Sequence, residues 1–233
     1  TELLLKDLET VQKRRERTER AAKSGDAKLK VELALLDKLL ARLDEGKPAR
    51  CDDEDVMALA KELGLISAKP LFYIANVDEG GLDSDNTHVE KVRAFATERG
   101  AQVVKICAKI EAEIMQLDES ERADFMAEMG LDHAGLEDVI RTGYRTLGLI
   151  TFFTAGEKEV RAWTIPEGAL APQAAGKIHS DFERGFIRAE VCDWQVLTEL
   201  GSEARVRAAG KLGSEGKGYV VKDGDVIVFR FNV

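Results

Sequence analysis

The sequence predicts a chain of mixed α+β and α/β class with more than one domain, and three observations support this prediction. Apolar residues in positions 1–46 follow a heptad pattern, which is typical of an antiparallel coiled-coil hairpin of helices. Between residues 47–149, two short apolar runs alternate with helical patterns, as in part of a doubly wound α/β domain. In residues 150–233, hairpin signals and alternating strands surround a helical pattern, which indicates a small α+β domain of β-grasp type.

Two stripes of regularly spaced residues define the predicted hairpin. Ser24-Gly25-Asp26 lies between them and is a turn signal. Leu35, Leu36, Leu39 and Leu40 widen the second stripe, so we expect the base of that arm to pack on further structure. The stripes recur at steps of four and three and consist of Leu4, Leu8, Val11, Arg15, Thr18 and Ala22, then Leu29, Leu33, Leu36, Leu40 and Leu43.

Composition and charge exclude several classes of protein. The chain has 233 residues, is 44% hydrophobic and carries a net charge of −9, so binding of nucleic acid through overall charge is not expected. No apolar run reaches the roughly 18 residues of a membrane span, and no signal peptide is visible. Three widely spaced cysteines favour reduced thiols in a cytoplasmic protein, which we expect to be a monomer. Because Thr1 lies inside a helical pattern, we expect a fragment whose front has been removed.

The middle domain contains two predicted parallel strands, one ending at Asn76 and one at Cys107. Two strands are too few for a stable sheet, so we expect the remaining strands to precede Thr1 in a longer protein. Asp52 or Asp53 is expected to cap the first helix of this domain. The predicted helices are residues 53–63, 88–99, 110–117, 119–129 and 136–147.

The C-terminal domain is predicted to contain one helix among several short strands. Trp163 and Phe229 lie in apolar strand patterns, so both are expected to be at least partly buried. Gly213 to Gly218 is interpreted as a loop before a strand. The predicted strands are 150–154, 160–165, 186–191, 218–221 and 225–231, and the predicted helix is 171–182.

Polar residues follow both predicted strands of the middle domain, where ligands of open α/β sheets bind. Asn76-Val77-Asp78-Glu79 and Cys107-Ala108-Lys109 resemble, in altered form, the Asn-Lys-x-Asp and Ser-Ala-Lys motifs with which GTPase-like proteins recognise a base. The sequence contains no G-x-x-x-x-G-K-[ST] motif, and Gly213 to Gly218 is too short in spacing to be one. We therefore expect no catalytic residue in this chain.

Other chemistry-bearing residues have simpler interpretations. His179-Ser180-Asp181 has the letters of a catalytic triad, but neighbours in sequence seldom converge, so a structural role is expected. The three histidines and three cysteines show no spacing of metal ligands, so no metal site is expected. Cys107 is interpreted as a small residue of the base loop rather than a nucleophile.

Several long segments together resemble the YchF family of Obg-like ATPases, also called EngD. These segments are the helical hairpin, Tyr73 to Glu79, Cys107 to Glu113, Leu147 to Trp163 and His179 to Val191. The resemblance covers essentially the whole chain. It implies that residues 47–149 are the C-terminal part of a P-loop NTPase domain without its P-loop, and that residues 150–233 are a ubiquitin-like TGS domain. It also implies an ATPase that binds ribosomes.

The resemblance further implies a base-recognition site, made of Asn76, Val77, Glu79, Cys107, Ala108 and Lys109. Glu79 stands where GTPase-like proteins have Asp, and its longer side chain is expected to misalign guanine. ATP and magnesium are therefore the implied ligands of the complete protein, with GTP less favoured. We expect neither to bind tightly to this chain alone, because the phosphate and magnesium groups are missing.

Basic residues of the first helix are a candidate contact for RNA, with ribosomal RNA the partner that the resemblance implies. Such a run is usually only a solvated face, yet here it stands out in an acidic protein. Lys158, Arg161, Arg184 and Arg188 form a second candidate surface near the C-terminus. The residues of the first surface are Lys13, Arg14, Arg15, Arg17, Arg20 and Lys23.

Two hypotheses of function therefore stand. The first is a nucleotide-dependent ATPase of the ribosome, of which this chain is the C-terminal part. The second is a non-enzymatic RNA- or ribosome-binding adaptor built from a coiled coil and a β-grasp domain. Only the residues from Asn76 to Glu79 and from Cys107 to Lys109 separate them, because they have a purpose in the first hypothesis and none in the second.

Overall fold

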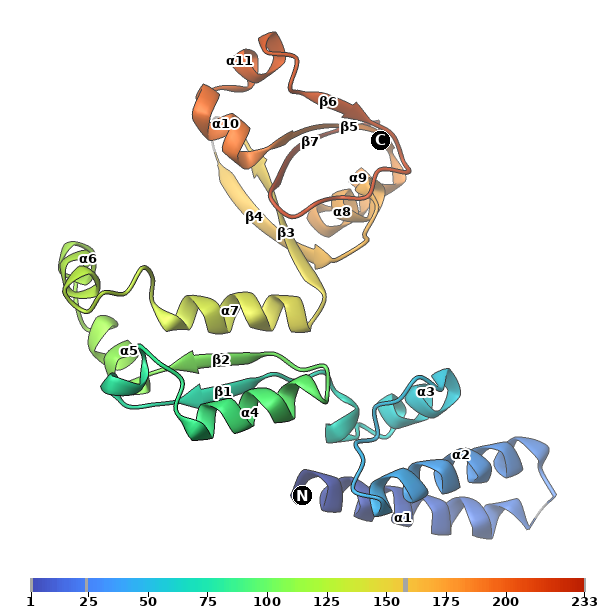
Figure 1. Cartoon of the computed structure of the whole chain (residues 1–233). Helices are drawn as coiled ribbons and strands as arrows, with labels where there is room; N and C mark the ends of the chain where they lie inside the picture. The colour runs from blue at the N-terminus through green and yellow to red at the C-terminus, as the bar shows by residue number, and fades with distance from the viewer. Residues whose placement is uncertain (1, 24, 157–158, 233) are drawn as a thin grey trace. The chain divides into compact units, whose positions relative to one another are not determined.

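The computed structural model describes residues 2–23, 25–156 and 159–232, and Figure 1 shows the path of the chain. The chain forms two compact units, Thr1–Leu71 and Phe72–Val233. Each unit has its own core. No helix in the described part of the chain is both long and apolar enough to cross a membrane.

The first unit begins with two helices that run in opposite directions, α1 (Glu2–Ala22) and α2 (Ala27–Asp44) (Figure 1). Asp26 caps α2 by accepting a hydrogen bond from the Lys28 backbone N–H, and Gly25 adopts a positive φ of 87° in the connection. Ser24, which the sequence also placed in this turn, lies outside the described residues. Val11 and Thr18 of the predicted seam are buried, and α1 and α2 pack along each other.

A third helix, α3 (Glu54–Glu62), and the 3-10 turn η1 (Ile66–Ala68) pack on the hairpin and complete its core. Asp53 caps α3 through a hydrogen bond from the Val56 backbone N–H. The contacts therefore group these two elements with α1 and α2, and the second unit starts only at Phe72. The base of the second arm does pack on further structure, as the widened leucine stripe predicts; the buried residues are Leu36, Leu39, Leu43, Val56, Leu59 and Ala60.

A buried carboxylate, Asp7 on α1, joins the hairpin to η1. Its side-chain oxygens accept hydrogen bonds from the backbone N–H groups of Ile66 (2.8 Å) and Ser67 (2.7 Å) and from the Ser67 hydroxyl (2.6 Å). The Ser67 oxygen accepts a further bond from the Ala49 N–H at 2.9 Å. Since Asp7 is only 1% exposed, it stays buried because these donors replace water. The heptad pattern does not reveal this role, because a polar residue at this position looks solvated.

The second unit starts with a small α/β layer. Its strands β1 (Tyr73–Asn76) and β2 (Val103–Ile106) pair in parallel, and α4 (Thr87–Thr97) packs on both of them. Both predicted strands form, but the second ends at Ile106 rather than Cys107, which is the N-cap residue of α5. The further elements of this layer are η2 (Glu79–Gly81), α5 (Ala108–Ile114), α6 (Glu119–Glu128) and α7 (Gly135–Thr146).

The C-terminal part of the second unit is a five-stranded mixed sheet of order β4-β3-β7-β5-β6. Strands β3 and β7 are parallel, and the other pairs are antiparallel. Helices α8 and α9 lie on the face that carries the main core, and α10 and α11 cover part of the other face (Figure 1). The elements are β3 (Leu149–Ala155), β4 (Val160–Pro166), α8 (Ala171–Ile178), α9 (Ser180–Arg184), β5 (Phe186–Asp193), α10 (Trp194–Leu200), α11 (Glu203–Ala208), β6 (Gly213–Glu215) and β7 (Asp225–Phe231).

Four details of this unit differ from the sequence prediction. Gly213–Glu215 is the edge strand β6, not a loop, while residues 218–221 contribute only an isolated bridge between Leu170 and Val220. The expected single helix over 171–182 breaks at His179, whose ring accepts the N–H of Asp181 and caps α9. Helices α10 and α11 were not predicted, because both are short. Helix α5 starts at Ala108 rather than Ile110.

The two aromatic residues singled out in the strand patterns do enter the core. Phe229 is 9% exposed and stands edge-on to Phe152, whose ring is fully buried. Trp163 is partly buried, stacks on Phe152 at 6.5 Å between ring centroids, and donates its indole N–H to the Thr154 hydroxyl at 2.9 Å. The expectation of at least partial burial is therefore confirmed for both residues.

Replacing Asp7 with alanine is expected to destabilise the first unit strongly. The change leaves three buried donors without an acceptor, which costs about 3 kcal/mol in the free energy of unfolding. Urea denaturation followed by circular dichroism measures this cost. Glu16→Ala, an exposed change on the same helix, is the matched control and is expected to alter stability by less than about 0.5 kcal/mol. Equal midpoints for the two variants would contradict the structural role of Asp7.

Candidate functional site

The parallel register brings the two candidate loops to one edge of the small sheet. Asn76, the last residue of β1, lies opposite Ile106, the last residue of β2. The Val77 backbone N–H continues the pairing by donating to the Ile106 carbonyl at 2.8 Å. Because strands of parallel pairs end on the same side, both loops begin next to each other, at the position where α/β proteins bind ligands.

A direct hydrogen bond joins the two loops. The Asn76 Oδ1 atom accepts the backbone N–H of Ala108 at 3.0 Å. Ala108 is the first residue of α5, so this N–H has no partner within the helix. Within the described residues, the side-chain amide NH2 group (Nδ2) of Asn76 donates to no protein acceptor, and Asn76 is exposed. Asn76 therefore positions the second loop and keeps two amide protons for a ligand.

The turn after β1 is tightly built. Asp78 caps η2 by accepting the Gly81 backbone N–H at 3.0 Å. A Cβ atom on Gly81 would lie 2.9 Å from the Cβ of Val77, so the turn closes only because residue 81 is glycine. Sequence reasoning treated Asp78 as the variable position of the motif and did not find this capping role. The Asx-type spacing from Asp78 to Gly81 was the available signal.

Glu79 and Lys109, one from each loop, form an ion pair with 2.7 Å between Oε1 and Nζ. The two side chains are 51% and 70% exposed, so solvent weakens the attraction. The hydrogen bond that Lys109 donates to Glu79 still raises the pKa of Lys109. The carboxylate that the sequence assigned to base recognition is thus already engaged by an ammonium group.

Cys107 anchors the second loop by packing against apolar side chains. It is 3% exposed and packs with Ile110 and Ile114 of α5 and with Leu82, the residue that follows η2. The thiol is buried among apolar side chains, which fits the interpretation as a small structural residue.

A second carboxylate that sequence reasoning missed orients α7. Glu111 on α5 accepts the backbone N–H groups of Gly135 (2.8 Å) and Leu136 (3.0 Å), the first residues of α7. The helix start has no capping side chain of its own, so Glu111 satisfies these two donors from a distance. Only the fold brings these residues together, because they are 24 and 25 positions apart.

The basic residues of α1 are mostly paired. Arg14 donates to Glu32 of α2 at 2.6 Å and to Glu62 of α3 at 3.3 Å, and the Glu32 hydrogen bond raises its pKa. Arg15 bonds Asp37 at 2.6 Å across the hairpin. Arg14 and Arg15 therefore hold elements of the first unit together. The other four predicted contact residues are exposed. Lys13 and Arg20 each pair with a glutamate of α1. Arg17 and Lys23 form no ion pair with the described residues.

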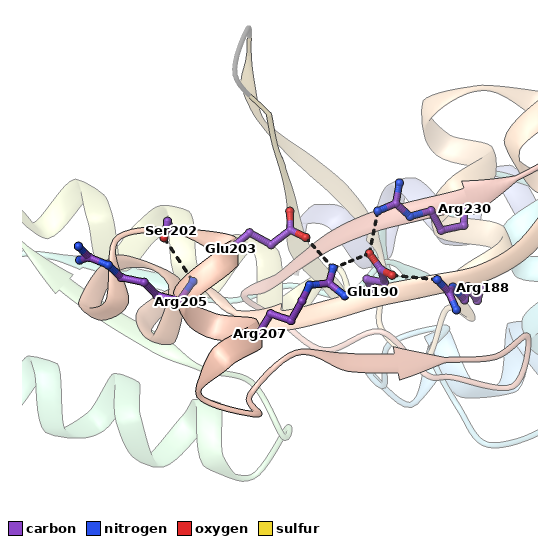
Figure 2. Close-up of polar contacts among 7 residues, drawn as sticks. All are labelled: Arg188, Glu190, Ser202, Glu203, Arg205, Arg207 and Arg230. Atoms are coloured by element: carbon purple, nitrogen blue, oxygen red, sulfur yellow. Dashed lines mark hydrogen bonds and ion pairs between the residues drawn. The ribbon is translucent and has the colours of Figure 1, made fainter.

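The basic residues of the C-terminal sheet behave differently. Arg188, which the sequence singled out, meets Arg207 and Arg230 around the carboxylate of Glu190 (Figure 2). Hydrogen bonding from Arg230 lowers the pKa of Glu190, so the stabilisation it supplies persists above its unfolded pKa and is lost as pH falls through the lowered value. Arg207 and Arg230 were not predicted, because only the fold gathers these distant residues.

The other cations predicted near the C-terminus do not contact the cluster around Glu190 in the described residues. Arg184 pairs with Asp181 within α9. The Arg161 guanidinium lies 4.2 Å from the centroid of the Trp163 ring, within range of a cation–π interaction. Lys158 lies outside the described residues.

No group of three or more His, Cys, Asp or Glu side chains within residues 2–23, 25–156 and 159–232 is arranged to hold a metal ion. His179 acts as a helix cap, as described above, rather than as a member of a triad. The three cysteines are free thiols.

The fold is of mixed α/β class, and two loops follow the parallel strands at one edge of the small sheet. Residues 149–232 match the family described as "YchF-GTPase_C: Protein of unknown function (DUF933)". The whole chain is 48% identical to "Ribosome-binding ATPase YchF" of Escherichia coli O157:H7, and equally to that of Bacillus subtilis strain 168. It is 42% identical to "Obg-like ATPase 1" of Oryza sativa subsp. japonica. These findings relate the chain along its whole length to the YchF family.

The relatives are longer than this chain. It spans 64% of the two bacterial proteins and 60% of the rice protein. Among solved structures, the YchF GTPase of Schizosaccharomyces pombe has a TM-score of 0.81 at 33% identity, covering 98% of this chain and 63% of that one. A GTP binding protein from Pyrococcus horikoshii OT3 has a TM-score of 0.53 at 18% identity over 78% of this chain and 51% of that one, a likeness of fold alone.

The amide of Ala108 is expected to report on the bond to Asn76. Asn76→Ala removes the acceptor, so hydrogen exchange at the Ala108 N–H should accelerate because nothing within α5 replaces the bond. Asn76→Asp keeps an oxygen acceptor in place and is the control, with exchange close to that of the original chain. Exchange followed by NMR measures both. Unchanged protection in Asn76→Ala would show that the two loops are not coupled in this way.

Proposed function

We propose that this chain is part of a ribosome-binding, YchF-like ATPase, and that it carries the base-recognition loops and ribosome-contact surfaces of the complete protein. The observation that carries this proposal is the joined pair of loops at the ends of β1 and β2, where Asn76 bonds Ala108 and Glu79 bonds Lys109. Relatives named as ribosome-binding ATPases support it. In this proposal residues 150–233 are a TGS domain of β-grasp type, which the parallel pair β3 and β7 in a mixed sheet supports.

Adenine is the proposed base. The side-chain amide NH2 group of Asn76 can donate to a ring nitrogen of the base such as N7, as asparagine does in recognition of adenine. Val77 offers an apolar contact to the ring, where the related GTPase motif has a lysine. The exposed loops at Cys107 to Lys109 supply backbone groups at the edge of the base, and Asn76 holds them in place.

The ion pair between Glu79 and Lys109 adds a second reason why guanine is disfavoured. Guanine recognition needs a carboxylate that accepts two N–H groups, but Glu79 already bonds Lys109 at 2.7 Å. Reading guanine therefore requires Glu79 to leave its ammonium partner and to fit a side chain one methylene longer than aspartate. Both requirements lower affinity for GTP relative to ATP.

The phosphates and magnesium are proposed to bind elsewhere in the complete protein, since the residues of this chain fit the base alone. The surface of the α/β layer supports the presence of more domain there. Ile74 of β1 is 48% exposed, and α7 exposes a stripe of apolar side chains at helical spacing. The stripe consists of Leu136, Ile140 and Tyr144, and Leu147, the residue that follows the helix, continues it. ATP and Mg²⁺ would be the ligands of that complete site.

The alternative function is a non-enzymatic RNA- or ribosome-binding adaptor. The hairpin and the C-terminal sheet suit both functions equally. The hydrogen-bonded strand ends favour the ATPase, because an adaptor has no use for an asparagine amide presented beside an acidic residue at a ligand edge. A G-x-x-x-x-G-K-[ST] motif encoded ahead of Thr1 would decide for the ATPase.

Two surfaces are proposed for contact with ribosomal RNA. Lys13, Arg17 and Arg20 on α1 are exposed, as is Lys23 directly after the helix. Arg14 is paired with Glu32 and Glu62 and therefore has a structural role. Glutamates of the same helix lie beside Lys13 and Arg20, so Arg17 and Lys23 are the cations of this surface that form no ion pair within the described residues. On the C-terminal sheet, Arg184 and Arg188 are exposed.

Glu79→Asp in the complete protein is expected to move preference from ATP toward GTP. The shorter carboxylate no longer reaches Lys109 and can face the base, as the aspartate of the GTPase motif does. We expect about a tenfold change in the ratio of the two affinities, which corresponds to one charge-assisted hydrogen bond. Calorimetry with non-hydrolysable ATP and GTP analogues measures it. Lys109→Met tests the ion pair separately, and an unchanged ratio in both variants would mean that Glu79 does not read the base.

The chain alone is expected to hydrolyse no ATP above background, because its sequence contains no recognisable group for the phosphates or magnesium. A phosphate-release assay with the purified 233-residue chain measures this. Glu79→Ala serves to exclude a contaminating enzyme. Turnover by the chain that Glu79→Ala abolishes would overturn the expectation.

A further inference from the structure

Three arginines converge on one carboxylate on the outer face of the C-terminal sheet (Figure 2). The Nη2 atoms of Arg188, Arg207 and Arg230 lie 3.1, 3.3 and 2.9 Å from the carboxylate oxygens of Glu190. Arg188 and Glu190 are two residues apart on β5, and Arg230 lies opposite Arg188 on β7, so all three share one face. Arg207 reaches the cluster from α11.

Like charges lie close together in this arrangement. Two arginines placed directly opposite each other on neighbouring strands repel one another. Glu190 offsets part of the repulsion, and its side chain is only 6% exposed, so a carboxylate has been buried to hold the arginines. Glu203 adds a second bond to Arg207 at 3.1 Å. Three cations against these two carboxylates still leave one positive charge in excess.

The guanidinium groups keep free donors. Their side chains are 50–56% exposed, while Glu190 is covered. The Nη2 atoms are occupied, and each guanidinium has further N–H groups with no protein acceptor among the described residues. Arginines presented in this way are suited to bidentate contact with phosphate oxygens, for which lysine would be a poorer choice.

We infer that Arg188, Arg207 and Arg230 form a contact for the phosphate backbone of RNA and that Glu190 is the positioning residue that aims them. The inference rests on the proposed function, in which the complete protein binds the ribosome, whose RNA presents such phosphates. It extends the predicted contact of Arg188 to two residues that no sequence pattern indicated. It also places the main RNA contact on the sheet rather than on α1, where Arg14 and Arg15 are used within the fold.

The surroundings of the cluster favour RNA over an acidic protein surface. Protein interfaces have apolar or aromatic anchors at their centre. Three arginines hold Glu190 in Figure 2, and their guanidinium groups are half exposed, whereas Val228, the apolar residue opposite Glu190 on β7, is partly buried. An excess of exposed arginine on this face suits a contact with phosphates, which supplies affinity without reading sequence.

Binding of the full 233-residue chain to a fluorescein-labelled RNA hairpin tests the inference. Fluorescence anisotropy is measured at about 50 and 200 mM KCl, since each neutralised phosphate contributes to the salt slope. Replacing Arg188, Arg207 and Arg230 by glutamine should weaken binding about tenfold or more and flatten the slope by about 2. Arg205→Gln is the matched control: Arg205 lies on the same helix, points away from the cluster in Figure 2 and bonds only the Leu200 carbonyl at 3.3 Å through its side chain, so little change is expected.

Glu190→Gln separates positioning from simple charge. The change makes the chain more positive, so an unspecific attraction to RNA would strengthen. If Glu190 aims the arginines, binding weakens by about threefold or more although net charge has risen, because the repelling guanidinium groups lose their common partner. Thermal unfolding by circular dichroism checks that each variant is folded. If this variant unfolds, Glu190→Asp, which keeps the charge and retracts the carboxylate, is expected to weaken binding in the same direction.

The outcomes distinguish this inference from the proposed function. Full binding by a folded triple variant, or tighter binding by Glu190→Gln, would overturn the inference and leave the proposed function standing. Co-sedimentation with ribosomes is measured in parallel. A chain that binds the hairpin through the three arginines but ignores ribosomes supports the inference and counts against the proposed function. Unlabelled poly-glutamate and unlabelled RNA are then compared as competitors at equal concentration of charge. Stronger competition by poly-glutamate would assign the surface to an acidic protein and would also overturn the inference.

Discussion

Carboxylates removed from water are the constraint on which this structure depends, because each needs donors, and the donors come from distant parts of the chain. Asp7 bonds Ser67, 60 residues away, and closes the first unit. Glu111 fixes the start of α7, and Asp225 receives the Tyr219 hydroxyl and the Lys222 N–H at the start of β7. Burial and the bond to Asp225 raise the pKa of Tyr219 above its ordinary value. In a chain with 43 acidic residues, the few that are covered decide how the loops close.

At the candidate base site, too, a side-chain oxygen accepts a backbone N–H from a distant segment, but here the residues are exposed. The parallel pairing of β1 and β2 brings two loops together, and the amide of Asn76 then satisfies the first N–H of α5. The glycine at position 81 lets the turn lie against Val77, and Cys107 anchors the second loop in the apolar layer beneath. The two loops are therefore joined without a ligand, and Lys109 is already paired with Glu79.

Charge has two different uses in the two units. On the hairpin, Arg14 and Arg15 form ion pairs with acidic residues of neighbouring helices, so their charges stabilise the first unit itself. On the C-terminal sheet, several arginines share one covered glutamate and stay half exposed, which leaves a local positive surface on an acidic protein. The total charge of −9 therefore says little about what either surface can contact.

By itself the sequence determined the elements whose signal is local. The heptad stripes, the apolar runs before Asn76 and Cys107 and the strands around Trp163 follow from periodicity, and the polar motifs at the strand ends indicate a ligand edge. Tertiary structure alone decided which polar groups meet. Asp7 with Ser67, Glu111 with Gly135 and Glu190 with its three arginines are separated by many residues and leave no periodic signal. Short elements such as β6, α10 and α11 also escaped, because their local preferences are weak and packing on the sheet stabilises them.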